Sequence, residues 1–340
     1  MLLTLAYEGI MKIVEISIRP KALQDQYSEL LLSEIRSFFH DPRTAELKQE
    51  IAVWVKCPAC DADDSKLYLS KDGLQLHICG QCGLVFMNPR PSENAMIEFF
   101  SQSKAIGIYS EMVDMTKAAR TELIFNPLAE FIVQNFEGGR LLEVGCGSGL
   151  LLDALAKKNI GWSLKGIEPS GRAVEICRSK GLDVFHGGLE EFDEAATYDL
   201  IVFWAVFDHF FDPYSIVKKA YALLKRGGSI LIGSMNIEGF DSMVLGEDNE
   251  AFSPPERQNF FGETSMGAML KRSGFKSVRV KTTGKLDVDI IKNYWVAGGK
   301  NGRTPFLERL VLGTASTAFQ EFLMKNNLSG HMTIIATKDT

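Results

Sequence analysis

Hydrophobic and polar positions alternate along most of this 340-residue chain between a strand-like and a helix-like period. Short apolar runs typical of buried strands occur at 140–144, 163–167, 182–185, 198–204 and 229–234. Stretches with helical spacing occur at 149–158, 171–180, 212–224 and 263–273, and two late strands are expected at 275–283 and 331–338. This alternation predicts an α/β fold whose seven-stranded, mostly parallel sheet carries helices on both faces.

The first 56 residues lie outside this alternation. Residues 12–18 form a short β-like run, and residues 23–39 have helical spacing up to the break at Asp41-Pro42. We interpret residues 1–56 as an extension whose helix packs on the body of the protein. A dimerisation or substrate-side role is the alternative, and the sequence leaves open whether Met1 or Met11 is the true start.

Residues 57–91 contain two cysteine pairs separated by eighteen residues. The pairs are Cys57 with Cys60 and Cys79 with Cys82, and a hairpin turning at residues 71–73 is expected between them. Two C-x2-C knuckles can direct four thiolates to one point, which is the ligand set of structural zinc. Because four cysteines complete the set, we expect a closed, structural Zn²⁺ ribbon, with His77 facing solvent.

The remaining residues, 92–340, are assigned to one main domain that follows a proline-flanked turn. Helices are expected at 93–100 and 116–136, the second interrupted at Asn126-Pro127, and both would lie over the mouth of a ligand site. The segments 235–262 and 285–330 are long for simple connections, so we interpret them as substrate-side insertions. The second contains one apolar helix at 305–324, which suits either the core or a homodimer surface.

The stretch from Leu141 to Gly149 is the centre of the predicted site. A buried strand runs into glycines at 145, 147 and 149, and a helix then begins. Such a turn brings backbone N–H groups close to a ligand, and ligands of parallel sheets lie beyond the carboxyl ends of the strands. The third glycine comes one residue too early for a dinucleotide motif, whereas Glu168 ends the next strand, where a carboxylate can accept ribose hydroxyls.

Composition excludes several classes of protein. The net charge is −6 and no long basic block occurs, so we expect no nucleic-acid partner. No apolar run approaches the roughly 18 residues of a membrane span, and no secretory signal is evident, so we expect a cytoplasmic protein. Six cysteines do not make a disulfide scaffold here, and Cys146 and Cys177 are interpreted as small packing residues.

The motif E-x-G-x-G-x-G, which begins at Glu143, resembles motif I of class I S-adenosylmethionine-dependent methyltransferases. Further segments between residues 115 and 283 resemble later parts of that Rossmann-like family in the same order. The resemblance implies that the glycine turn holds the methionine end of S-adenosylmethionine, that Glu143 orients its amino group, and that Glu168 binds the ribose. The cofactor-binding residues implied in this way are Glu143, Gly145, Cys146, Gly147, Gly149, Glu168, Pro169, Leu189, Glu190 and Trp204.

A narrower resemblance uses the cysteine ribbon and the run "CGLVFMNPRP" that follows it. Together with a methyltransferase core, they resemble a bacterial group associated with sugar and surface-glycan modification. That group shows Glu-His-x-x-Asp-Pro where this chain has Asp208-His209 and Asp212-Pro213, and Pro-Pro-Glu-His where this chain has Arg257 as the fourth residue. Two residues of the expected site therefore depart from the group.

The resemblance implies methyl transfer to a small-molecule acceptor, and a sugar or nucleotide-sugar is the one we expect. His209 would be the base, and Arg257 would stand at a changed base position or bind an acceptor phosphate or carboxylate. The alternatives are a helix-capping histidine and a solvated loop arginine. The alternative functions for the whole protein are a methyltransferase that acts on RNA or protein, and a cofactor-binding protein with reduced or lost catalysis.

Overall fold

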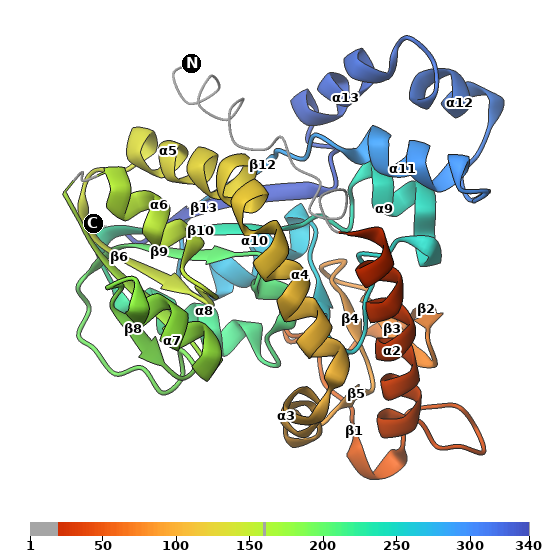
Figure 1. Ribbon diagram of the computed structural model, residues 1–340, viewed down its shortest axis with the longest axis horizontal. Helices are drawn as coiled ribbons and strands as arrows, with labels where there is room; N and C mark the ends of the chain where they lie inside the picture. The colour runs from red at the N-terminus through yellow and green to blue at the C-terminus, as the bar shows by residue number, and fades with distance from the viewer. Residues whose placement is uncertain (1–19, 159–160, 340) are drawn as a thin grey trace.

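The structure is a computed structural model that describes residues 20–158 and 161–339, and its main feature is a central seven-stranded sheet (Figure 1). The strand order is β12-β13-β10-β9-β6-β7-β8. The strands from β10 to β8 run parallel, and β13 lies antiparallel between β10 and β12. Their bounds are β6 Gly139–Val144, β7 Trp162–Glu168, β8 Val184–His186, β9 Tyr198–Trp204, β10 Leu224–Met235, β12 Ser277–Thr282 and β13 His331–Thr337. The predicted Rossmann-like fold is confirmed.

Helices cover both faces of this sheet and bury two separate cores. On one face lie α5 (Asn126–Asn135), α6 (Leu150–Lys158) and α7 (Gly171–Ser179), and on the other lie α8 (Pro213–Leu223) and α10 (Glu263–Arg272). Strand β9 alternates between the two cores, with Val202 on the first face and Phe203 on the second. Burial on both faces explains why this strand is an unbroken apolar run in the sequence.

The N-terminal part forms a second, smaller layer beside the main sheet (Figure 1). Strands β2 (Ser65–Lys71), β3 (Leu74–Cys79) and β4 (Val85–Met87) form the expected ribbon, and β11 (Asn259–Phe260) completes it as a fourth strand. Helix α2 (Lys21–Phe39) packs against α4 (Lys104–Arg120), and β1 (Ala52–Val53) pairs with β5 (Arg90–Pro91). The ribbon sheet therefore includes a strand from the segment 235–262. The expected run at residues 12–18 lies outside the described residues.

Several helices differ from the expectation. Helix α3 (Glu93–Gln102) is capped by Ser92 as predicted, but α4 begins at Lys104 and continues through a π-helical turn, Thr121–Phe125, into α5. The wide turn relieves the backbone just before Pro127, which has no N–H to donate. The single helix expected at 305–324 is wrong. It divides into α12 (Pro305–Val311) and α13 (Ser316–Lys325) around Gly313, where a Cβ would lie 2.2 Å from the Arg309 carbonyl oxygen.

The remaining elements of the insertions are α9 (Phe240–Leu245), α11 (Asp287–Val296) and the 3-10 turn η4 (Gly246–Asp248). Two further 3-10 turns, η1 (Gln49–Ile51) and η3 (Phe207–His209), lie outside the insertions. Helices α9, α11, α12 and α13 bury an apolar cluster of their own, which includes Leu245, Ile291 and Trp295. No helix among the described residues is long and apolar enough to cross a membrane.

Arg90 connects the ribbon to the main sheet. Its side chain is fully buried, and it donates hydrogen bonds to Met87 O at 3.2 Å, Phe211 O at 2.8 Å and Asn259 Oδ1 at 3.3 Å. Burial lowers the pKa of this guanidinium to about 10, but it stays charged near neutral pH. One buried cation thus joins β4, β11 and the loop after η3.

We expect Arg90→Met to lower the free energy of unfolding by about 3 kcal/mol, because three acceptors lose a charged donor inside the protein. Urea unfolding of the purified protein measures the change. Arg43→Met is the matched control, because its partner Asp41 lies beside it on the surface. Equal unfolding midpoints for the two variants would show that Arg90 does not hold the layers together.

Candidate functional site

The turn between β6 and α6 lies where the strand order reverses, because β6 pairs with β7 on one side and β9 on the other. Gly145, Gly147 and Gly149 have φ values of 71°, 52° and 72°, which only glycine adopts readily. A Cβ at Gly145 would lie 2.7 Å from Val206 Cγ2, and one at Gly149 would lie 2.6 Å from Leu182 Cδ1. At Gly147 no described atom lies within 4 Å of that position, so the turn is open there.

Glu168 fixes this turn from the end of β7. Its Oε2 accepts the Gly147 N–H at 2.8 Å, and its Oε1 accepts the Ser170 N–H at 2.9 Å. Each carboxylate oxygen keeps a second lone pair for a further donor. The residue predicted to bind a ribose is therefore also the residue that orients the glycine turn.

Glu143 lies buried beneath the same turn, and its Oε2 has no hydrogen-bond partner among the described residues. Burial raises the pKa of this carboxyl well above its usual value, and the charges of Cys177 and Glu168 act in the same direction. A buried acid without a donor is costly unless a ligand supplies one. The ammonium group of a bound amino acid moiety would do so, which fits the role predicted for Glu143.

The other predicted cofactor residues lie along the same edge of the sheet. Trp204 ends β9, Pro169 follows β7, and Leu189 with Glu190 follows β8. The Leu189 side chain is buried in the core, whereas the Glu190 side chain is exposed to solvent at this edge. Cys146 is buried beside Gly166, and its thiol and that of Cys177 both donate to the Gly147 carbonyl oxygen, at 3.8 and 3.2 Å.

Asp208 and Arg257, the two departures from the resembling group, contact each other. Arg257 Nε lies 2.8 Å from Asp208 Oδ2, and the Asp208 side chain is almost fully buried. Burial alone raises the pKa of the Asp208 carboxyl, but Arg257, followed by His209, holds it below its usual value. Arg257 Nη1 also contacts Ala251 O at 3.2 Å and Met235 Sδ at 3.8 Å.

His209 belongs to the same cluster. Its Nε2 lies 4.0 Å from Asp208 Oδ1, and its Nδ1 lies 2.8 Å from the Glu256 carbonyl oxygen. A carbonyl only accepts, so Nδ1 carries the proton and Nε2 is left as the basic nitrogen of the neutral ring. Tyr27 of α2 donates to Glu256 Oε1 at 2.7 Å, so the N-terminal helix supports this loop.

His331 is a residue that the sequence reasoning missed. The sequence places it at the start of the last strand, and its ring lies 5.7 Å from that of Trp204, at the edge where the glycine turn ends β6. The only signal in the sequence is an imidazole at the first position of a mostly apolar strand. That signal becomes informative only once the direction of β13 is known.

The four predicted metal ligands converge as the spacing suggested. The Sγ atoms of Cys57, Cys60, Cys79 and Cys82 all lie within 4.8 Å of one another, and the pairs Cys57–Cys82 and Cys60–Cys79 are 3.5 Å apart. Zinc–sulfur bonds of about 2.3 Å require sulfurs roughly 3.7 Å apart, which suits this set. Burial raises the pKa of Cys60 to about 11, so a bound cation is needed to favour the thiolate.

Comparisons with known proteins agree with the geometry of the glycine turn. Residues 116–280 match a protein family described as a methyltransferase domain. This part of the chain is a class I S-adenosylmethionine-dependent methyltransferase domain. The match contains β6 to β10 and the complete glycine turn.

Two curated relatives are similar to this methyltransferase domain. The ubiquinone biosynthesis O-methyltransferase of Vibrio parahaemolyticus is 28% identical over 129 residues, which are 35% of this chain and 54% of the relative. The malonyl-[acyl-carrier protein] O-methyltransferase of Priestia megaterium is 28% identical over 139 residues, which are 40% of this chain and 50% of the relative. The chain thus spans about half the length of these relatives.

Among solved structures, an S-adenosylmethionine-dependent methyltransferase of Thermotoga maritima aligns with a TM-score of 0.45 at 19% identity. The alignment covers 69% of this chain and 96% of the other.

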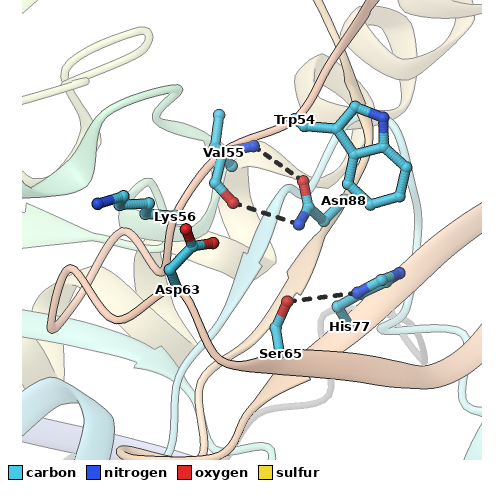
Figure 2. Close-up of a pocket in the computed structure, with 7 residues that line it drawn as sticks. All are labelled: Trp54, Val55, Lys56, Asp63, Ser65, His77 and Asn88. Carbon is cyan, nitrogen blue, oxygen red and sulfur yellow. Dashed lines mark hydrogen bonds between the residues drawn. The ribbon is translucent and has the colours of Figure 1, made fainter.

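A cavity of about 480 Å³ lies on the ribbon, apart from the methyltransferase edge (Figure 2). Figure 2 shows the Asn88 amide bonded to both backbone groups of Val55, and His77 facing Ser65. The Trp54 ring lies 5.8 Å from that of His77. The expectation that His77 faces solvent is therefore wrong, because Trp54 and β2 half-bury it.

We expect Gly147→Ala and Gly149→Ala to separate ligand binding from stability. Each substitution places alanine at a positive φ, which lowers the free energy of unfolding by about 1 kcal/mol. Only Gly149→Ala also overpacks the site against Leu182 and Cys177, which lowers it by about 1–3 kcal/mol more. Gly147→Ala should remain folded and lose at least about tenfold in affinity for S-adenosylmethionine, since its methyl occupies the open side of the turn. Thermal unfolding and calorimetric titration measure the two effects. Unchanged affinity in Gly147→Ala would mean that the ligand does not approach this side.

We expect about one zinc ion per chain in the purified protein, lost in Cys79→Ser, because removing one thiolate opens a closed tetrahedral site. Elemental analysis after dialysis gives the stoichiometry. Cys177→Ser, a cysteine outside the cluster, is the control and should keep the metal. A wild-type protein without bound metal contradicts the zinc assignment.

Proposed function

We propose that this protein transfers a methyl group from S-adenosylmethionine to a hydroxyl of a small-molecule acceptor, and that the acceptor is a sugar or nucleotide-sugar. The observation that carries the first part is the open glycine turn over two buried acids, Glu143 and Glu168, at the switch point of the sheet. A polar cluster around Asp208 lies on the neighbouring strand end and supplies a place for the acceptor.

On the cofactor side, the chain's residues bind and orient. When bound, S-adenosylmethionine supplies a methyl group already activated by a positive sulfur. Glu143 accepts from its amino group, Glu168 accepts from the ribose while it holds the Gly147 amide, and the segment 188–190 borders the adenine. Cys146 in the glycine turn and Trp204 at the end of β9 are buried and would border the cofactor. All of these residues lie at the edge of the sheet where the parallel strands end.

On the acceptor side, His209 takes the hydroxyl proton at Nε2. Its Nδ1–H is committed to the Glu256 carbonyl, and the Asp208 carboxylate beside Nε2 stabilises the imidazolium that forms. Arg257 compensates Asp208, so the pair is electrically neutral before the proton moves. This changes the role first considered for Arg257, because Nε and Nη1 already have partners within the protein.

Support for transfer to an oxygen atom comes from the two O-methyltransferases to which the domain is similar. Support for a sugar comes from the resemblance of the ribbon, the "CGLVFMNPRP" run and the Asp208–Pro213 segment to the glycan-associated group. In this chain Asp208 and Arg257 form a buried ion pair, and an intact polar cluster favours a working site over a vestigial one.

Cofactor binding is tested first, by thermal shift and calorimetry with S-adenosylmethionine and S-adenosylhomocysteine. We expect both ligands to stabilise the fold, because a ligand that binds only the native state raises its melting temperature. Stabilisation by neither would contradict the proposal at its first step.

Transfer is tested with methyl-labelled S-adenosylmethionine and a panel that contains dTDP-glucose, UDP-glucose, GDP-mannose, total RNA and casein. We expect label on a nucleotide-sugar, and we expect His209→Asn to lower kcat by about a hundredfold with unchanged cofactor affinity, since the base is lost. His77→Asn, on the ribbon, is the control and should retain the wild-type rate. Label only on RNA or casein would overturn the acceptor class, and bound cofactor without any transfer would favour lost catalysis.

A further inference from the structure

His331 reaches the acceptor side because of the direction of its strand. Strand β13 is antiparallel to β10, and His331, its first residue, pairs with Met235, the last residue of β10. The carboxyl ends of the parallel strands and the beginning of β13 therefore share one edge. The first side chain of β13 is placed at the edge where β9 ends in Trp204.

The neighbours of His331 connect it with the Asp208 cluster. The His331 ring lies 5.7 Å from the Trp204 ring. Met235 is the cross-strand neighbour of His331, and its Sδ lies 3.8 Å from Arg257 Nη1. The same guanidinium holds Asp208 through Nε. Although burial raises the pKa of the Asp208 carboxyl, the charges of Arg257, His209 and also His331 lower it.

The backbone before His331 is held firmly. Asn236 donates its N–H to Gly330 O at 2.8 Å and its side-chain amide to Ser329 O at 3.0 Å. The Ser329 N–H donates to Thr282 Oγ1 at 3.2 Å, and the Gly330 N–H donates to Asp287 Oδ1. A side chain at the end of such a fixed turn is preorganised for contact with a ligand.

We propose that His331 is a second acceptor-binding imidazole, which hydrogen-bonds the hydroxyl next to the one that is methylated while His209 serves the reacting hydroxyl. This inference rests on the proposed function and narrows its substrate class to acceptors with neighbouring hydroxyls. Two imidazoles at one edge of the sheet, His209 beside Asp208 and His331 beside Trp204, can serve two adjacent oxygens, whereas an acceptor with a single hydroxyl would use only one. His331 thereby makes the enzyme specific for acceptors that carry two neighbouring hydroxyls.

The charge state of His331 depends on groups from each element around it. Asp208 and His209 come from η3 and Arg257 from the loop before β11. Asp241 of α9 and Asp287 of α11 enclose the preceding Gly330, and burial raises the pKa of both carboxyls, that of Asp241 to about 7. The pKa of the Asp208 carboxyl, in contrast, lies below its usual value, so Asp208 stays ionised throughout the neutral range.

The first experiment follows the five histidine ring resonances of the full-length protein by NMR during a pH titration. We expect Asp208→Asn to lower the pKa of His331 by about one unit, because a nearby negative charge favours the imidazolium. His186, which lies at the far end of the sheet on β8, is the internal control and should not shift. An unmoved His331 pKa separates it from the Asp208 cluster and overturns the proposal.

The second experiment adds UDP-glucose, or UDP alone, to the complex with S-adenosylhomocysteine and observes the same resonances. We expect UDP-glucose to move the His331 signal and UDP alone to leave it in place. A His331 signal that neither UDP-glucose nor dTDP-glucose moves contradicts the proposal. Absence of S-adenosylhomocysteine binding in the same samples would instead contradict the proposed function, so the two failures are distinguishable.

The third measurement uses steady-state methyl transfer to the acceptor that the panel identifies. His331→Asn should raise the KM for that acceptor about tenfold while the Kd for S-adenosylmethionine stays as in the wild type. With a deoxy analogue that lacks the neighbouring hydroxyl, wild type and variant should have the same KM. An equal rise for both acceptors would reduce His331 to a structural residue and contradict its role in specificity.

Discussion

The turn from β6 into α6 requires three positive φ values in five residues, and the rest of the site depends on that constraint. Side chains at Gly145 and Gly149 would collide with Val206 and Leu182, so the turn is packed against the loop after β9 and the segment before β8. Only Gly147 is open, and its amide is aimed by Glu168. Packing on two sides and an opening on the third leave one direction for a ligand, directly above the switch point of the sheet.

The cluster that follows β9 is organised by one buried ion pair. Taking Asp208 out of water is costly, and Arg257 offsets that cost at 2.8 Å. Considered one at a time, the replacements of Glu by Asp208 and His by Arg257 suggest a weakened site. In the folded protein, however, the two residues are in direct contact and form one ion pair. Arg90 connects the ribbon to the loop that follows this cluster, because it donates hydrogen bonds to Phe211 O and Asn259 Oδ1.

Much of the fold could be predicted because its signals are local. The strand bounds, the Ser92 cap, the cysteine knuckles and the glycine turn each depend on residues close together in the chain. Two differences from the expectation have different causes. The helix at 305–324 breaks at Gly313 beside the Arg309 carbonyl oxygen, which is a local contact, whereas His77 is half-buried by Trp54 from another segment. In the same way, β11 joins the ribbon from about 170 residues away, which hydrophobic periodicity cannot indicate.

For the site, the sequence alone predicted the glycine turn, its two acids and the four clustered cysteines, because each pattern is a fixed spacing along the chain. Only the tertiary structure decided that Asp208 and Arg257 form a pair, that Arg257 Nη1 contacts the Ala251 carbonyl oxygen, and that His331 lies beside Trp204. The physical reason is the antiparallel insertion of β13, which brings the beginning of the last strand to the edge where the parallel strands end. Strand direction is a property of the assembled sheet, and no short stretch of residues encodes it.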